Sequence, residues 1–421
     1  MKILMIFQNA PYPPDIGPSK RNFPFFLETL KRHEVSVLSF GTADDERKFR
    51  DAYGDRCRHV VFVNNSRSRI LNFISRMWRL FTGQSSYLQF WSPKLQKALD
   101  RLIAQEKFDL IHCCTTILGY HELPHTIPLV GDMHNVEYDN VYRAYEQTKN
   151  ILTKPYYYWE HVLLKRDETR ITDKFNVVVT TTERDRDIIR KELPNKAIHV
   201  IPNGVDPAFF KQQPVEEDPH TIVFAGLMSY YPNYHGILYF LDEIFPLIRE
   251  QNPQARLLVV GAYPPKRLQH RANEYITVTG FVDDVKPYFA TGRVFAIPLL
   301  IGGGIRGKAL EAMAMRRPIV STTLGCEGIN LKHEESALFA DTPQDFANSV
   351  IRLLNDAALR KKLTDKAYQN VVEGYSWEVN GLTLERVYQS LVPKADIVFG
   401  NHPPNPSRPA KGLVPSTQQA E

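Results

Sequence analysis

The chain alternates short apolar runs with helix-like segments, and it does so in two successive series. Apolar runs of the first series begin near Lys2, Val35, His59, Leu110, Leu129 and Phe175. Those of the second series lie at Thr221–Ala225, Arg256–Val260, Ile276–Phe281, Val294–Leu299, Ile319–Thr322 and Ala337–Ala340. Such alternation builds parallel sheets covered by helices. We therefore predict an α/β chain of two facing Rossmann-like domains, with a cleft between them at the carboxyl ends of the strands.

Residue periodicity and helix-forming composition predict several helices between these runs. They lie at Arg21–Lys31, Lys94–Ala104, Tyr156–Thr172, Glu183–Glu192, Pro232–Arg249 and Trp377–Leu391. A polar, proline-bearing stretch up to His220 predicts a linker. We expect a first domain over residues 1–205, a second over 206–375, and a helix over 376–392 that packs back on the first. Residues 393–421 are rich in Pro, Ser, Asn and Gln, which predicts a flexible tail.

The composition is that of an ordinary soluble globular chain. Its 421 residues are 43% apolar and 24% charged, which suits two domains and a tail. The net charge of +5 is scattered and does not favour nucleic acid. The four cysteines lack disulfide or metal-site spacing, and the apolar N-terminal run is too short for a signal peptide. We therefore expect a cytoplasmic protein without a membrane span.

A glycine-rich turn, with Gly302, Gly303 and Gly304 in succession, joins an apolar run to a helix-like segment. Glycines let the backbone approach a ligand, and a helix start offers unpaired N–H groups and a positive dipole end. Arg306 and Lys308 add full charges, so the turn predicts a site for a phosphate or diphosphate. Glu311, one helical turn later, would repel phosphate. We expect it to accept the hydroxyls of an adjacent ribose or sugar.

The same turn has the Gly302-x-Gly304-x-x-Gly307 spacing of dinucleotide-binding proteins, and Glu327 lies where their ribose-binding acid would be. In those proteins the motif follows the first strand of its domain. Here three apolar runs of the same half precede the turn, so NAD binding is the weaker interpretation. A glycine-rich turn with solvated cations is a further alternative.

Four motifs, in this order along the chain, resemble glycosyltransferase family 4, whose members have the GT-B fold. They are Gly17-Pro18-Ser19-Lys20-Arg21-Asn22, Ile201-Pro202-Asn203-Gly204-Val205-Asp206, Lys308-Ala309-Leu310-Glu311-Ala312-Met313-Ala314 and Pro318-Ile319-Val320-Ser321-Thr322. The similarity covers residues 1–392. The segment Gly226–Asn233 and the triple glycine are similar to the branch that contains sugar transferases of bacterial exopolysaccharide or exosortase systems.

This resemblance implies a retaining hexosyltransferase that uses a nucleoside diphosphate-sugar and needs no essential metal or other cofactor. It implies donor contacts from Gly17, Gly226, Gly303, Gly304, Ile305 and Glu311. The family commonly has two glutamates, of which Glu311 matches the second, whereas the first falls on Gly303. The usual Arg and Lys after the first strand of the second domain are absent between Gly226 and Gly236. We expect Arg306 and Lys308 to stabilise the leaving diphosphate in their place.

In the first half, the resemblance matches His134 to a histidine that touches the donor sugar. We expect His134 to position a sugar hydroxyl, or to stabilise an oxocarbenium-like centre through its backbone carbonyl. Asp132, Asn135 and Glu137 are candidate contacts for the acceptor. A histidine that only caps or hydrogen-bonds a helix start is the alternative.

Two further patterns have weaker functional interpretations. Asp185 and Asp187 have the D-x-D spacing of metal-dependent transferases, but they lie at a charged helix start, where acids suit the dipole, so we expect no metal site. Residues 67–91 combine an apolar helical face with arginines on another face, which predicts a helix that docks on an anionic membrane. A core-facing helix with solvated arginines is the alternative.

These features predict a glycosyltransferase that moves a sugar from a nucleoside diphosphate-sugar to a glycan or lipid-linked acceptor in cell-surface polysaccharide synthesis. It would act in the cytoplasm, with peripheral attachment to the inner face of the plasma membrane as an option. The loss of the first glutamate at Gly303 favours an alternative, a non-catalytic nucleotide-sugar-binding protein. An NAD-dependent oxidoreductase is the weakest alternative.

Overall fold

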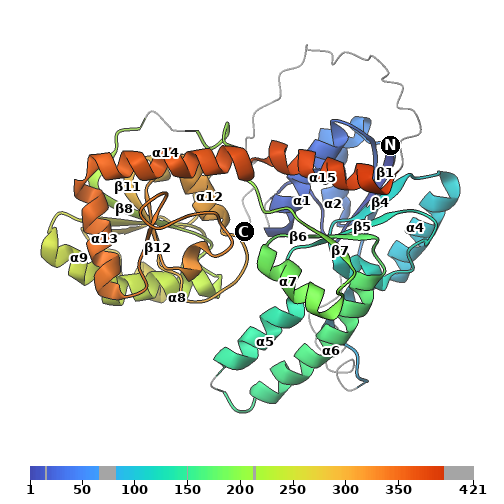
Figure 1. Cartoon of the computed structure of the whole chain (residues 1–421), viewed down its shortest axis with the longest axis horizontal. Coiled ribbons are helices and arrows are strands. Elements are labelled where there is room, and N and C mark those ends of the chain that lie inside the picture. The colour runs from blue at the N-terminus through green and yellow to red at the C-terminus, as the bar shows by residue number, and fades with distance from the viewer. Residues whose placement is uncertain (15–16, 66–81, 149, 212–214, 393–421) are drawn as a thin grey trace, which may run out of the picture.

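The computed structural model of the chain describes residues 1–14, 17–65, 82–148, 150–211 and 215–392. Two parallel sheets with flanking helices form the two halves of the molecule (Figure 1). The predicted α/β architecture of two Rossmann-like domains is therefore confirmed.

The first sheet has seven strands within the described residues, in the order β3-β2-β1-β4-β5-β6-β7. The strands are β1 Lys2–Phe7, β2 Glu34–Phe40, β3 Val60–Val63, β4 Leu110–Cys113, β5 Leu129–Met133, β6 Val177–Thr180 and β7 Ala197–Val200. Along β1, Ile3 and Met5 join one apolar cluster while Leu4 and Ile6 join another. The sheet is thus buried on both faces, which explains why its strands read as continuous apolar runs.

The second sheet has the order β10-β9-β8-β11-β12-β13. Its strands are β8 Asp218–Ala225, β9 Arg256–Val260, β10 Ile276–Val278, β11 Gly292–Ile297, β12 Ile319–Ser321 and β13 Leu338–Phe339. Both sheets therefore share a doubly wound order, which reverses between β1 and β4 in one and between β8 and β11 in the other. Ligands of such sheets bind beyond the carboxyl ends of the strands at this reversal.

Helices connect the strands in both halves. Those of the first half are α1 Gly17–Leu30, α2 Ala43–Tyr53, α4 Pro93–Gln105, α5 Glu137–Gln147, α6 Lys154–Asp173 and α7 Glu183–Glu192. Those of the second half are α8 Tyr231–Tyr239, α9 Phe245–Gln251, α10 Lys266–Gln269, α11 Lys286–Thr291, α12 Gly307–Ala314, α13 Pro343–Asn355 and α14 Ala357–Gly374. The helix expected over Pro232–Arg249 differs, because a π turn at Phe240–Ile244 interrupts it. Pro246 lies two residues after this turn, and its missing N–H and bulky ring favour such an irregularity.

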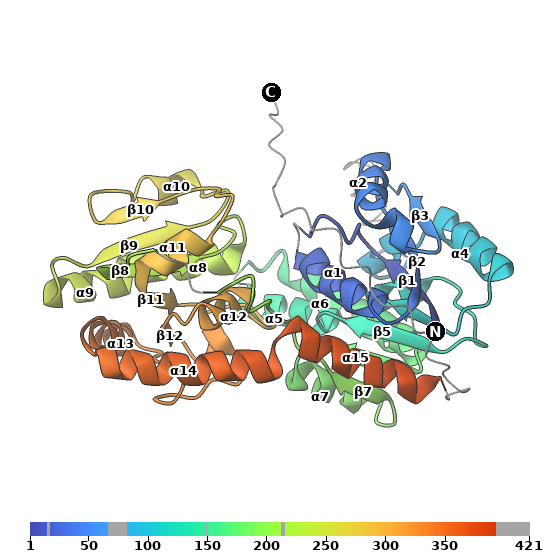
Figure 2. The ribbon, with the colours of Figure 1, turned by 90° about the horizontal axis from the view of Figure 1, so that it is seen from above.

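The last helix, α15 Trp377–Leu391, returns from the second half and lies along the first (Figure 1, Figure 2). Leu384, Val387 and Tyr388 join an apolar cluster of the first half. The Tyr388 hydroxyl lies 2.6 Å from Nδ1 of His112 on β4. The predicted helix that crosses back is therefore present, and it is anchored in the core of the first half.

Gly381 lets α15 pack directly against α1. A Cβ atom on Gly381 would lie 2.5 Å from Cγ of Glu28, a buried residue that Lys31 and Arg32 hold by ion pairs. We predict that Gly381→Ala lowers the free energy of unfolding by about 1–3 kcal/mol, because α15 must move away from α1. Gly374→Ala is the control, since a Cβ there meets no atom within 4 Å and alanine favours helix. Equal urea midpoints for the two variants would contradict this packing role.

Candidate functional site

The glycine-rich turn connects β11 to α12, and its backbone needs glycine. Gly302 and Gly304 have φ angles of 109° and 76°, in the left-handed region that other residues rarely adopt. A Cβ on Gly303 would lie 3.5 Å from Nη1 of Arg143, and a Cβ on Gly304 would lie 3.4 Å from Oδ1 of Asn135. The turn of the second domain therefore lies against the segment around the start of α5 in the first domain.

Arg306 follows the turn and is 8% exposed. Its Nη1 donates to the carbonyl of Gly303, but Nε and Nη2 are buried without a hydrogen-bond partner in the described part of the chain. Burial lowers the pKa of this guanidinium. Buried donors without partners are costly, and a guanidinium with unused N–H groups matches phosphate oxygens. The arrangement around Arg306 is thus suited to an anionic ligand.

Lys308 lies in the first turn of α12, and its Nζ donates to Oδ1 of Asn233 at 2.7 Å. Burial, and then the charge of Arg306, lower the pKa of Lys308 to about 7. A Cβ on Gly226 would lie 3.1 Å from this Nζ and 2.6 Å from Nδ2 of Asn233. Gly226 therefore leaves the space through which the lysine reaches the carboxyl end of β8.

Glu311 lies one turn further along α12. Burial raises the pKa of this carboxyl, while the charges of Lys20 and Lys308 act in the opposite direction. Lys20 belongs to α1, so the start of α1 approaches α12 from the other domain. Gly17, the first residue of α1, is exposed, and a Cβ there would meet no atom within 4 Å, so packing does not require glycine. Ile305 is buried in the core of the second domain.

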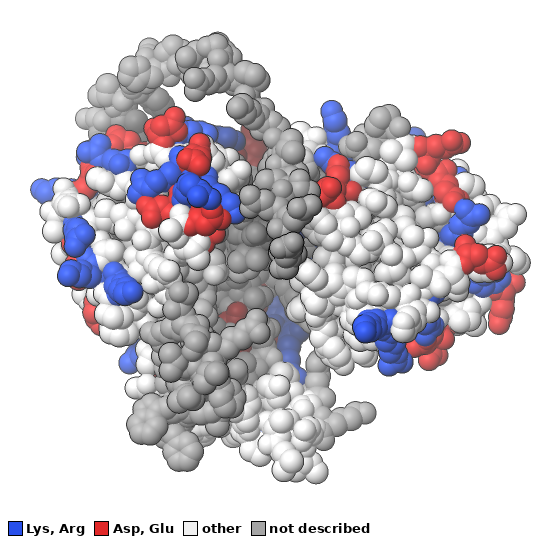
Figure 3. Space-filling view, turned by 180° about the vertical axis from the view of Figure 1, so that it is seen from behind, with Lys and Arg blue, Asp and Glu red and all other residues white. Residues whose placement is uncertain are grey.

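A hollow separates the two halves of the molecule, and Lys or Arg atoms are visible inside it (Figure 3). The second half contributes the glycine turn, the start of α12 and Gly226 to this region. The first half contributes the starts of α1 and α5. These segments follow the carboxyl ends of the strands, where the ligand crevice of such sheets is expected. The structure therefore brings the predicted donor-side segments of both halves together.

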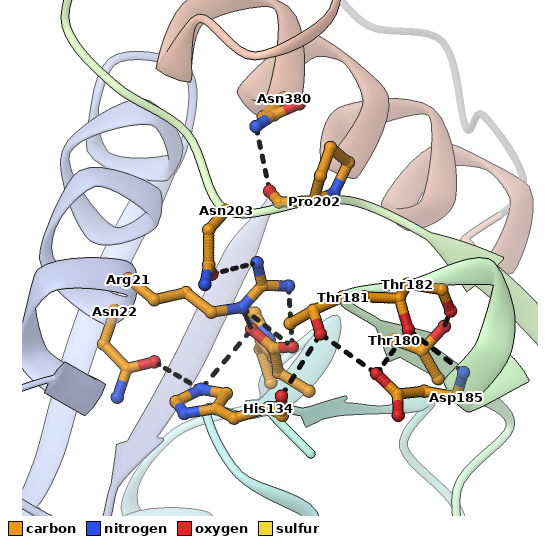
Figure 4. Close-up of polar contacts among 12 residues, drawn as sticks. Arg21, Asn22, His134, Thr180, Thr181, Thr182, Asp185, Pro202, Asn203 and Asn380 are labelled. Atoms are coloured by element: carbon orange, nitrogen blue, oxygen red, sulfur yellow. Dashed lines mark hydrogen bonds and ion pairs between the residues drawn. The ribbon is translucent and has the colours of Figure 1, made fainter. Parts of the chain in front are cut away.

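A buried ion pair joins α1 to the end of β5. Arg21 donates from Nε and Nη2 to both carboxylate oxygens of Asp132 at 2.9–3.2 Å, and from Nη1 to Oδ1 of Asn203 at 3.1 Å (Figure 4). Burial alone would raise the pKa of Asp132, but the charges of Arg21 and His134 hold it below its ordinary value. Asp132 is only 1% exposed. Arg21 contacts both of its oxygens, and a contact between Asp132 and the acceptor stays a prediction.

His134 lies beside this ion pair with its side chain 18% exposed. Its Nε2 lies 3.1 Å from Oδ1 of Asn22 (Figure 4). The ring also hydrogen-bonds the backbone of Cys114. Burial lowers the pKa of His134 to about 4, so the ring is neutral near pH 7. The His134 carbonyl accepts from Oγ1 of Thr181 at 3.2 Å. A neutral imidazole held in this way can orient a hydroxyl group, but it carries no positive charge.

Asn135 and Glu137 lie where α5 begins. Glu137 accepts hydrogen bonds from the side chain of Asn135 and from the hydroxyl of Tyr87, at 3.1 Å for the latter, and burial raises its pKa. Sequence reasoning missed Glu168, which accepts the backbone N–H groups of Glu137 and Tyr138. Burial, and then the charge of Glu137, raise the pKa of Glu168 to about 8. Glu137 is thus engaged within its own domain, whereas Asn135 approaches the glycine turn.

Asp185 and Asp187 lie in the first turns of α7, where their carboxylates are engaged locally. Asp185 accepts from the hydroxyls of Thr182 at 2.7 Å and Thr181 at 3.2 Å, and Asp187 pairs with Arg186. Among the residues that the structure describes, no group of three or more His, Cys, Asp or Glu side chains is placed to hold a metal ion.

Most of the predicted amphipathic helix lies outside the described residues, because residues 66–81 are not described. The described remainder includes a 3₁₀ turn at Ser86–Phe90 and Trp91, which is 41% exposed. No described helix is long and apolar enough to cross a membrane. Membrane docking through residues 67–91 stays a prediction.

Two family descriptions match the chain in the order of its two halves. Glycosyltransferase Family 4 matches residues 28–209, and Glycosyl transferases group 1 matches residues 219–356. The chain belongs to the family 4-like glycosyltransferases of the GT-B fold. In this glycosyltransferase the glycine turn follows β11, the fourth strand of its half, so the fingerprint position of NAD-binding domains is not matched.

Relatives match this glycosyltransferase over nearly its full length. An uncharacterized 44.6 kDa protein in the cps region of Klebsiella pneumoniae is 20% identical over 390 residues, which cover 89% of this chain and 96% of the relative. An uncharacterized glycosyltransferase of Methanocaldococcus jannaschii is 24% identical over 412 residues, with coverages of 90% and 95%. Anabaena HepE in complex with UDP has a TM-score of 0.66 at 15% identity, covering 93% of this chain and all of HepE. The HepE complex with UDP-glucose has a TM-score of 0.64.

Removing Arg21 would leave the buried carboxylate of Asp132 without its partner. We predict that Arg21→Ala lowers the free energy of unfolding by about 3–5 kcal/mol. Arg47→Ala is the control, because Arg47 pairs with Asp44 on the surface, and its urea midpoint should hardly change. Similar midpoints for the two variants would show that the Arg21 pair does not hold the domain together.

Proposed function

We propose that this glycosyltransferase moves a hexose from a nucleoside diphosphate-sugar to a glycan or lipid-linked acceptor, with retention of the anomeric configuration. The observation that carries the proposal is the pair of cations at the start of α12. Arg306 has two buried donor atoms without a partner in the described residues, and Lys308 lies beside it. A diphosphate would supply the acceptors that these groups lack. The complexes of HepE with UDP and UDP-glucose support this class of ligand.

The proposed roles follow from where charge develops in the reaction. As the bond between the sugar and the diphosphate breaks, the leaving group gains negative charge. Arg306, Lys308 and the free N–H groups at the start of α12 stabilise that charge, so we propose no essential metal. Glu311 accepts the ribose hydroxyls, and the neutral ring of His134 orients a hydroxyl of the transferred sugar. Gly303 and Gly304 bring backbone close to the donor.

A role in cell-surface polysaccharide synthesis is supported by the Klebsiella relative, whose name places it in a cps region. We therefore favour a glycan or lipid-linked acceptor, reached from the cytoplasm or at the inner face of the membrane. Gly303, which replaces the first glutamate that family members commonly carry, favours a second candidate function. In that case the protein binds nucleotide-sugars without transferring the sugar.

Affinity for a diphosphate-sugar should fall as the pH rises through 7. The pKa of Lys308 is lowered to about 7 in the unliganded protein, so its positive charge is present below this pH and lost above it. We predict that the affinity for UDP-glucose, measured by calorimetry, falls by up to about tenfold across this range. UDP-glucose is the suitable probe because its diphosphate does not titrate near pH 7. Lys308→Arg should remove the dependence, since a guanidinium stays charged. A flat wild-type profile would contradict the assigned titration.

The candidate enzyme and the candidate binding protein differ in their response to loss of His134. Thermal-shift measurements with UDP-, GDP- and ADP-sugars would first identify the donor. We predict that His134→Ala then lowers transfer on the order of 100-fold, while UDP affinity stays within the wild-type range. A wild-type rate in this variant would exclude His134 from the reaction. Donor binding without any transfer to a cell-derived lipid acceptor would support the binding protein.

A further inference from the structure

The hairpin formed by α5 and α6 projects from the first half of the molecule (Figure 1). Ile151 and Leu152, in the connection between its helices, are 82% and 89% exposed. These are the highest exposures of any large apolar side chain in the described ranges. Two adjacent aliphatic side chains at a projecting tip are unfavourable in water and are typical of a contact surface.

Both helices carry exposed aromatic side chains behind this aliphatic pair. Tyr158 and Trp159 on α6 are 51% and 49% exposed, and Tyr142 on α5 is 37% exposed. The rings lie close together, with centroids 5.7 Å apart for Tyr142 and Tyr145 and 5.5 Å apart for Tyr145 and Tyr158. Tyr and Trp concentrate where the apolar core of a bilayer meets the headgroups. An aliphatic tip with an aromatic belt behind it matches that boundary.

The charge of the tip also suits a lipid surface. Between Asn150 and Trp159 the sequence holds one charged residue, Lys154, and no acid. Its Nζ lies 4.9 Å from the centroid of the Tyr145 ring, so the ammonium lies on the same belt. Lysine can keep its ammonium among headgroups while its stem packs on apolar surface. The projecting lower end of the molecule shows few charged atoms in Figure 3, in agreement with this composition.

We propose that the α5–α6 tip docks on an anionic bilayer by inserting Ile151 and Leu152 into its interface. A fluid bilayer accommodates a convex apolar tip, whereas a protein partner would have to supply a matching groove. This surface is distinct from residues 67–91, and the proposal does not depend on them.

The position of the hairpin links docking to the cleft. Asn140 on α5 approaches the glycine turn, since a Cβ on Gly303 would lie 3.8 Å from its Oδ1. The 11 residues of α5 then span about 16 Å from the cleft toward the tip. A bilayer held at the tip would bring a lipid-linked acceptor near the donor site. This consequence rests on the proposed function, whereas the docking itself does not.

Flotation with vesicles of phosphatidylcholine and phosphatidylglycerol tests the docking. Ile151→Ser combined with Leu152→Ser should lower the vesicle partition constant on the order of tenfold or more, because two aliphatic side chains no longer enter the interface. Phe281→Ser is the matched control, since Phe281 is 72% exposed in the second half and should leave flotation unchanged. Lys154→Gln should weaken binding less, and mainly at low salt. Equal flotation of the wild type and the double variant would overturn the proposal.

Fluorescence quenching locates the contact. Lipids with brominated acyl chains should quench the wild type, and Trp159→Phe should remove most of that quenching. Quenching that Trp159→Phe leaves undiminished would mean that only another surface enters the bilayer, and it would overturn the proposal. Self-association that depends on Ile151 and Leu152, with no vesicle binding, would overturn it in favour of a second copy of the chain.

Donor binding separates the docking from the proposed function. The double serine variant should keep wild-type affinity for UDP-glucose and wild-type transfer to a soluble acceptor analogue, because the tip takes no part in the chemistry. A loss of donor affinity in this variant would mean that the hairpin supports the cleft, which would overturn a docking role. Flotation without donor binding in the wild type would refute the proposed function and support the docking.

Discussion

The buried pair of Arg21 and Asp132 holds together the segments that form the first-domain wall of the cleft. Arg21 comes from α1, Asp132 lies in β5, and Asn203, which Arg21 also contacts, lies in the connection between β7 and β8. Because neither charge is hydrated, separating them would leave an uncompensated charge in the interior. The three segments are therefore fixed relative to one another. His134 and Asn22, each close in sequence to one partner of the pair, take their positions from it.

The second-domain wall of the cleft is formed by the glycine turn, whose backbone lies close to side chains of α5 and forms no ion pair with them. At position 303 the glutamate that the family commonly carries would project toward Arg143, whose Nη1 is 3.5 Å from the Cβ position of Gly303. Arg143 is held by Asp139 at 3.1 Å, and Arg184 holds the same carboxylate at 2.7 Å. A Cβ at position 303 would make only ordinary contacts with Arg143 and Asn140, so packing against α5 does not itself require glycine there. The departure from the family pattern leaves this part of the cleft with one carboxylate fewer.

Sequence patterns predicted what depends on neighbours along the chain and missed what depends on distant partners. Apolar runs predicted most strands correctly because both faces of each sheet are buried. Strand β7 was not predicted because Ile198 is its only buried residue. Arg306 and Lys308 could be proposed as site residues from the sequence because the glycines, the cations and the helix start are contiguous. The ion pair of Asp132 could not be predicted because its partner, Arg21, lies 111 positions away in the chain. Asp132 lies in β5, whereas Asn135 and Glu137 lie where α5 begins, so closeness in sequence did not give the three side chains common partners.

Two positive charges of the second-domain wall of the cleft, those of Arg306 and Lys308, favour a ligand that gains negative charge, such as a leaving diphosphate. Burial lowers the pKa of both Arg306 and Lys308, and the charge of Arg306 lowers the pKa of Lys308 further. An empty cleft therefore leaves unfavourable charge in a region of low dielectric constant. A bound diphosphate relieves it, and a diphosphate that is leaving relieves it further, because each added fraction of negative charge meets two fixed cations and the start of α12. In the proposed reaction, the repulsion between Arg306 and Lys308 favours the transition state over the bound donor, which is the condition for catalysis rather than for binding alone.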